Sequence, residues 1–288
     1  MKKESSRVGF VIADALWLAG FVGIWTLLIA YWNTWWVLVL VPMFTLMLAG
    51  IGELLHQTAH YNLFGRVRLW NDVIGWIAAA MVGIDLKTYR PFHLKHHRAV
   101  NTGDDPERAI YSFPEYAEKA EGWKTLSNWN KAKMVFGIAS RFSHALVSVL
   151  GANAPLVRIM RVTIPSFIVL TGFFEGLFFL IPAKMIVAWY MPLFLVSFVD
   201  LLLTQSRHYG TELKAEARRV PLPEQYEISW NLKLPLIIEL MILRRNLHAE
   251  HHEYPAIHWS IARDKQAGRT LPLAAYLQAW WANGPRVM

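Results

Sequence analysis

Histidine is concentrated at four places in the chain, in a pattern that could bind metal ions. Nine of the 11 histidines fall in HQTAH, HLKHH, HAEHH and a single site before YG. They are His56, His60, His93, His96, His97, His208, His248, His251 and His252. On a helix, positions i, i+3 and i+4 project from one face, so each box gathers its imidazoles. Adjacent histidines diverge by about 100° on a helix, which favours two metal ions over one.

Composition and spacing exclude several other uses of these histidines. The chain has no cysteine, which excludes disulfides, thiolate nucleophiles, iron–sulfur clusters and cysteine-ligated zinc. Gln57 stands where a zinc protease of the H-E-x-x-H type needs glutamate, which disfavours peptide hydrolysis. Haem takes two axial ligands, and zinc takes about four ligands in total. Nitrogen ligands suit iron, zinc, copper or nickel, and two iron ions with four or five imidazoles each would use the whole set.

Long apolar runs indicate the elements that must hold these histidines. The chain has 288 residues, of which 55% are hydrophobic. Its mean hydropathy is +0.27. Four runs have about the length needed to cross a hydrocarbon core of roughly 30 Å: 8–32, 36–55, 162–181 and 185–203. Two shorter stretches, 73–84 and 234–243, are predicted to be re-entrant or interfacial helices. We therefore predict one all-α integral membrane domain over residues 1–288, with four transmembrane helices in two hairpins.

The distribution of charge predicts how these helices are oriented. The net charge is +8, but the basic residues do not interleave with a soluble binding fold, so nucleic acid is not an expected partner. The two short connectors between paired runs carry Lys184 as their only basic residue. By the positive-inside rule both hairpins point outward and both termini are cytoplasmic. All nine histidines then lie on the cytoplasmic side, in a helical cap and at the inner ends of the spans. The expected location is a bacterial inner membrane, where the site faces a lipid-like substrate.

The boxes resemble those of the membrane fatty acid desaturase-like superfamily, which includes acyl desaturases, alkane hydroxylases and carotenoid ketolases and hydroxylases. HQTAH, HLKHH and HAEHH meet its three-box pattern, and NLHAEHHEYP at 246–255 is similar to the third box of desaturases. HYG at 208–210 is similar to an additional alkane hydroxylase motif, although Thr204 and Arg207 stand where that motif has Asn and Glu. The resemblance implies a four-span membrane enzyme with two iron ions as cofactors and dioxygen as co-substrate. It also implies a separate electron donor of the ferredoxin, rubredoxin or cytochrome b5 type.

The expected activity is oxidation of an unactivated C–H bond by iron and dioxygen, with a fatty acyl or lipid desaturase favoured by the third box. The same site could act as a hydroxylase or ketolase on a carotenoid, an alkane, or a small amine- or amino-acid-like substrate. The outcome depends on whether the substrate radical loses a second hydrogen or rebounds with hydroxyl. A non-catalytic metal-binding membrane protein is the third reading; a transporter would need polar residues along a route through the spans, and few are present.

Carboxylates near the boxes are expected to orient the imidazoles and to offset the charge of the metal. The candidates are Glu53, Asp104, Asp105, Glu250 and Glu253, together with Asn246. Gly-Asp-Asp-Pro is also ordinary turn chemistry. Three acidic residues inside or near the apolar runs could contact a polar part of the substrate or bond between helices: Asp14, Glu175 and Asp200. His144 and His258 are predicted to lie outside the metal set.

Overall fold

The computed structural model describes residues 2–82, 84–107, 122–153, 164–211, 214, 216–263 and 269–285. The chain is mostly helical, as the apolar runs predict. The long helices are α1 (Lys2–Ala30), α2 (Val37–Ala59), α6 (Asn128–Asn153), α8 (Ile164–Leu180) and α10 (Met191–Arg207). Between α8 and α10 lie α9 (Pro182–Met185) and a π-helical turn, η5 (Ile186–Tyr190). Helix α9, the turn η5 and helix α10 follow one another directly and form one long apolar stretch.

Among the described residues, three helical stretches are long and apolar enough to cross a membrane: Arg7–Ala30, Val37–Arg66 and Pro182–Arg207. The described part of the third predicted span is α8, whose 17 residues rise about 25 Å. Two further helices, α3 (Arg68–Met81) and α4 (Leu86–Ala99), meet at a bend of 95° and together have the length of a broken span or a re-entrant loop. The two-hairpin arrangement, the single domain and the cytoplasmic position of the cap stay predictions.

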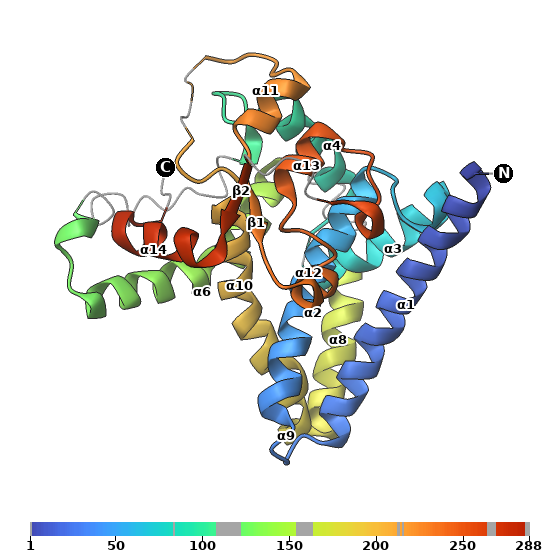
Figure 1. The fold of residues 1–288 in the computed structure, drawn as a ribbon. Coiled ribbons are helices and arrows are strands. Elements are labelled where there is room, and N and C mark those ends of the chain that lie inside the picture. The colour runs from blue at the N-terminus through green and yellow to red at the C-terminus, as the bar shows by residue number, and fades with distance from the viewer. Residues whose placement is uncertain are drawn as a thin grey trace.

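The remaining elements are short and lie near the ends of the long helices. They are η1 (Phe64–Arg66), η3 (Trp123–Thr125), α11 (Leu222–Glu227), α12 (Leu236–Met241), α13 (His248–Glu253), η6 (Trp259–Ile261) and α14 (Leu273–Asn283). Strands β1 (Asn231–Lys233) and β2 (Thr270–Pro272) pair in parallel, a small departure from the all-α prediction. In Figure 1, α9 lies at the narrow end of the molecule, whereas α4, α11 and α13 lie together at the opposite, wider end.

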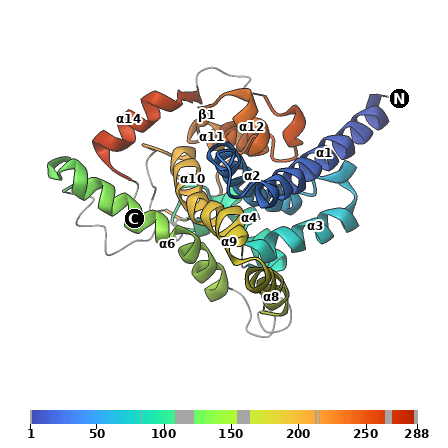
Figure 2. The same ribbon diagram turned by 90° about the horizontal axis from the view of Figure 1, so that it is seen from below.

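Helix α2 lies near the centre of the bundle, with α1 and α10 beside it (Figure 2) and α3 packed against it. Its glycines permit the close packing that joins it to the segment before α13. A Cβ at Gly50 would lie 2.6 Å from a ring carbon of Trp17 and 2.7 Å from the carbonyl oxygen of Met241. The Trp17 indole nitrogen donates to that same carbonyl at 3.1 Å. One small residue in α2 therefore lets α1, α2 and the end of α12 meet at a single point.

The chain turns sharply between α12 and α13. Leu243 and Arg244 both have a φ of 54°, in the left-handed region that side chains other than glycine disfavour. Residues held there cost of order 1–3 kcal/mol each and persist only when surrounding contacts fix them. Arg244 donates to the carbonyl oxygens of Ser260 and Ala262, which supplies such contacts. The turn brings the start of α13 back against α2, where the first histidine box lies.

Candidate metal centre

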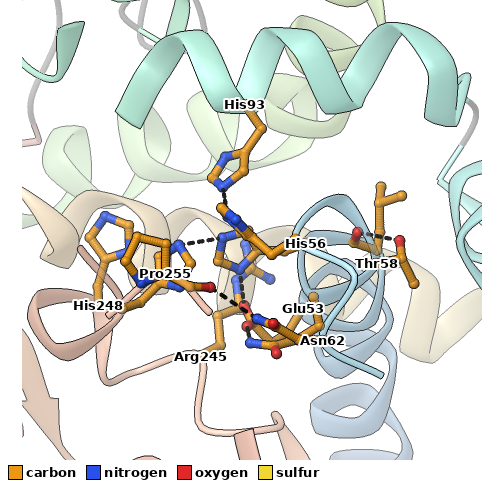
Figure 3. A network of polar contacts seen from close by, with 12 residues as sticks. Glu53, His56, Thr58, Asn62, His93, Arg245, His248 and Pro255 are labelled. Atoms are coloured by element: carbon orange, nitrogen blue, oxygen red, sulfur yellow. Dashed lines mark hydrogen bonds and ion pairs between the residues drawn. The ribbon is translucent and has the colours of Figure 1, made fainter. Parts of the chain in front are cut away.

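Four elements carry the nine boxed histidines to one place. His56 and His60 come from the end of α2, and His208 follows directly after α10. Helix α4 supplies three histidines and α13 the other three. Asp85 caps α4 by accepting the backbone N–H of Thr88, which fixes where that helix begins. In Figure 3, His93 points from α4 toward His56 on α2, with His248 beside them.

The nine imidazoles form two groups. One group holds His56, His60, His93, His97 and His251; the other holds His96, His208, His248 and His252. Within each group, one nitrogen from every ring lies within 4.8 Å of all the others. The adjacent pairs 96–97 and 251–252 are divided between the groups, as the divergence of neighbouring side chains on a helix predicts. Every member is buried except His60, which is partly buried.

Oxygen atoms of the protein fix the tautomer of several rings through Nδ1. The carboxylate of Glu53 accepts from His56 at 2.8 Å, and the carboxylate of Asp105 accepts from His96 at 2.9 Å. The carbonyl of Ile228 accepts from His208 at 2.9 Å, and the side-chain oxygen of Gln225 accepts from His252 at 3.0 Å. Each oxygen can only accept, so in the neutral ring the hydrogen is on Nδ1. The Nε2 atom of each of these rings is then a bare lone pair.

The Nε2 nitrogens of neighbouring rings face one another at distances that suit ligands of a common ion. In the first group, the Nε2 atoms of His56 and His251 are 2.8 Å apart, and those of His60 and His93 are 2.9 Å apart. In the second, Nε2 of His248 lies 2.9 Å from that of His252. Where both nitrogens of such a pair are bare, their lone pairs repel. Donors about 2.0–2.1 Å from one ion sit about 3 Å apart when they occupy neighbouring positions, so a cation in each group would turn the repulsion into coordination.

Unpartnered buried nitrogens lead to the same conclusion. Nε2 of His96 is buried and has no hydrogen-bond partner. Buried polar atoms are nearly always paired, and one left unpaired in a native structure calls for an explanation such as an ion. Imidazole nitrogens without thiolates suit iron, copper, zinc or nickel. The donor set therefore fits a two-metal site.

The protein environment keeps these ligands in the form that binds metal. Burial, reinforced by the neighbouring imidazoles, holds the pKa of His248, His251 and His252 well below the ordinary value of 6.5. Metal coordination needs the neutral imidazole. Near neutral pH these three rings therefore need not lose a proton to bind an ion.

The fatty acid desaturase family model matches residues 33–280, a segment that includes all nine histidines of the two groups. The chain belongs to the fatty acid desaturase family. Together with its apolar helices and its two histidine groups, this makes it a membrane oxidoreductase of an iron-dependent family.

Only part of the predicted carboxylate set lies against the histidines in this desaturase-family chain. Glu53 and Asp105 contact ring nitrogens, whereas Asp104 is exposed on the surface. Asn246 donates to the carbonyl of Leu232 and to Glu239, so it braces the segment before α13. Glu250 is fully buried in α13, and Glu253 at its end is partly buried. The two adjacent aspartates thus have different environments that their sequence does not distinguish.

Two residues beside the histidines were missed by the sequence reasoning. Glu107 places Oε1 3.3 Å from Nδ1 of His93, and Gln225 binds His252 from α11. Glu107 follows the predicted Asp-Asp-Pro turn closely, so a search for carboxylates could have been extended to it. No pattern near Gln225 points to the site.

The other singled-out polar residues make structural contacts. Asp14 accepts from the backbone N–H of Phe64, from Trp259 and from His258. Glu175 accepts from Tyr190, and Asp200 pairs with Arg245. His258 lies outside both histidine groups. The side chain of His144 falls outside the described residues.

Proposed function

We propose that this chain is a dioxygen-dependent, non-haem di-iron membrane enzyme that desaturates a fatty acyl or lipid chain. The observation that supports it most directly is the division of nine buried imidazoles into groups of five and four. Membership of the fatty acid desaturase family supports an acyl substrate. Bound iron would supply the activation of dioxygen that breaking an unactivated C–H bond requires.

The residues around the histidines would keep two iron sites in place. Glu53 and Asp105 hold the rings of His56 and His96 in a fixed orientation and offset part of the metal charge. The side chains of these two histidines and two carboxylates are buried, which strengthens electrostatic interactions between the carboxylates and a cation. An apolar substrate can reach such a site from the lipid because the histidines lie at the ends of apolar helices.

The electron balance of desaturation requires a partner. Reduction of one dioxygen to two waters takes four electrons and four protons, and forming one double bond supplies two of each. The other two electrons and two protons must come from outside the substrate, and the chain has no cysteine that could hold an iron–sulfur cluster to relay the electrons. We propose a separate ferredoxin, rubredoxin or cytochrome b5-type protein. Lys95 and Arg98 are exposed on α4, which carries three of the histidines, and would attract an acidic donor.

The deciding experiment combines metal analysis with isotope labelling. Purified protein should contain about two iron ions per chain, and His251→Ala should lower iron content and abolish turnover. His258→Gln, a buried histidine outside both groups, serves as the matched control and should keep its iron. Cells that express the gene are compared with cells that lack it, and their lipids are analysed by mass spectrometry after growth under ¹⁸O₂.

The products separate the possible functions. A lipid that loses two hydrogens and gains no ¹⁸O supports desaturation. Gain of one ¹⁸O atom would show a hydroxylase, and further oxidation to a ketone would show a ketolase. Two bound iron ions without oxygen consumption would indicate a non-catalytic metal-binding protein. One stoichiometric zinc in fully active protein would refute the di-iron proposal.

A further inference from the structure

Glu107 lies between the two histidine groups. Its side chain is buried, with Oε1 3.3 Å from Nδ1 of His93 and Oε2 3.7 Å from Nε2 of His96. His93 belongs to the five-histidine group and His96 to the four-histidine group. We infer that Glu107 supplies an oxygen donor to the four-histidine group, in addition to contacting the five-histidine group through His93. This inference rests on the proposed di-iron function.

The contacts of His96 show why a cation is expected beside Glu107. Nδ1 of His96 donates to Asp105 at 2.9 Å, so its Nε2 is a bare lone pair in the neutral ring. That Nε2 has no hydrogen-bond partner and faces Oε2 of Glu107. When His96 is neutral, as a metal ligand must be, two acceptors face each other there inside the protein, where their repulsion is poorly screened. A cation bound by both atoms removes the repulsion.

The separation of these two atoms fits a shared ion. Nitrogen and oxygen donors bind such metals at about 2.0–2.2 Å, so two donors of one ion lie between about 3 Å and about 4.2 Å apart. The 3.7 Å between Nε2 of His96 and Oε2 of Glu107 is within that range.

A role in orienting the His93 ring does not by itself explain why Glu107 lies at this place. Glu53 and Asp105 accept from their histidines at 2.8 Å and 2.9 Å, ordinary hydrogen-bond lengths. Glu107 lies 3.3 Å from His93, beyond the usual range of about 2.7–3.2 Å. Its position is nevertheless fixed, because its backbone N–H donates to Oδ1 of Asp105 at 2.9 Å. Asp105 thus holds His96 from one side and positions Glu107 on the other.

The test compares Glu107→Gln with Glu216→Gln in full-length protein loaded with ⁵⁷Fe(II) under anaerobic conditions. Glutamine keeps an oxygen that can accept from His93, so only the anionic donor is lost. Glu216 is exposed and serves as the control for removal of one negative charge. Iron per chain is measured against a graded chelator, the two iron environments are resolved by Mössbauer spectroscopy, and size-exclusion elution shows whether each variant is folded.

Each outcome decides the inference. We expect Glu107→Gln to bind one of its two iron ions at least 10–100-fold more weakly, the loss typical of even an indirect metal partner. One of two Mössbauer signals should then disappear, with both kept in Glu216→Gln. A folded Glu107→Gln protein with two iron ions and the wild-type spectrum would overturn the inference, as would equal weakening of both ions. Failure of the wild-type protein to bind two iron ions would refute the proposed function itself, and this would be visible before any variant is compared.

Discussion

Asp104 and Asp105 are adjacent in sequence, and replacing each in turn separates a role at the metal site from a role in the turn. Asp105 is buried and accepts three hydrogen bonds: from Nδ1 of His96 at 2.9 Å, and from the backbone N–H groups of Asn101 at 2.8 Å and Glu107 at 2.9 Å. Asp104 is exposed. Asparagine has nearly the size of aspartate, but one of its two oxygens is replaced by an NH₂ group that cannot accept.

The expected loss follows from this geometry. In Asp105→Asn, the remaining oxygen can stay at Oδ1 and keep the bonds to His96 and Glu107. The NH₂ group then faces the N–H of Asn101, and that buried donor is left unpaired at a cost of about 1–3 kcal/mol. Asparagine also lacks the negative charge that Asp105 holds against His96, and changing such an outer partner weakens metal binding about 10–100-fold, which corresponds to roughly 1.4–2.7 kcal/mol. The loss should fall mainly on the four-histidine group, to which His96 belongs.

The assay is iron retention against increasing concentrations of a chelator, with Asp104→Asn as the matched control. Asp105→Asn should release one iron ion at a chelator concentration about 10–100-fold lower than wild type, whereas Asp104→Asn should follow the wild-type curve. Equal curves for the two variants would contradict the role given to Asp105. Early release from Asp104→Asn alone would show that the two carboxylates have been assigned the wrong way round.

Three further predictions concern the scaffold and its orientation. Gly50→Ala would place a Cβ 2.7 Å from a backbone oxygen, so we expect about 1–3 kcal/mol of destabilisation. This would be measured as a lower thermal unfolding temperature in detergent. Gly23→Ala, with open space around it, should leave that temperature nearly unchanged. Arg245→Met removes one partner of a partly buried ion pair and should cost about 1–3 kcal/mol, again measured by thermal unfolding. In Asn33→Cys, the exposed cysteine should react with an impermeant thiol reagent in intact cells. In Lys95→Cys, the exposed cysteine should react only after the membrane is opened. Labelling of Lys95→Cys from outside would refute the predicted orientation.

The boxed histidines could be predicted from the sequence because their spacing along one helix determines which rings lie together. A helical spacing of three or four residues places rings on one face, and α4 and α13 are helices over their boxes. The division of His96 from His97 into different groups follows from the same angular argument. The single His208 has no spacing of its own, and it was linked to the others by its place at the end of an apolar run and by the resemblance of HYG to an alkane hydroxylase motif.

The supporting residues could be predicted less well because their roles depend on how distant segments pack. Gln225 reaches His252 across 27 residues, and the carbonyl of Ile228 reaches His208 across 20. A backbone carbonyl leaves no mark in the sequence. For Asp104 and Asp105, a one-residue difference in a turn decides which side chain points inward, and the sequence of the turn suits both arrangements.

The charged pair of Arg245 and Asp200 shows how the histidine-bearing elements keep their relative positions. Arg245 lies three residues before His248, donates to the carbonyl of Ala49 in α2 at 3.1 Å, and pairs with Asp200 in α10. Its guanidinium fits because Gly52 has no side chain: a Cβ there would lie 3.2 Å from Nη1. An ion pair removed from water adds little net stability over apolar packing, and this one is partly buried, but its partners must meet in one arrangement. An apolar residue at 245 could slide along α2, whereas Arg245 can satisfy its charge and its hydrogen bonds only where Asp200 and Ala49 meet. The position of the third box relative to the first is therefore set by a side chain that belongs to neither histidine group.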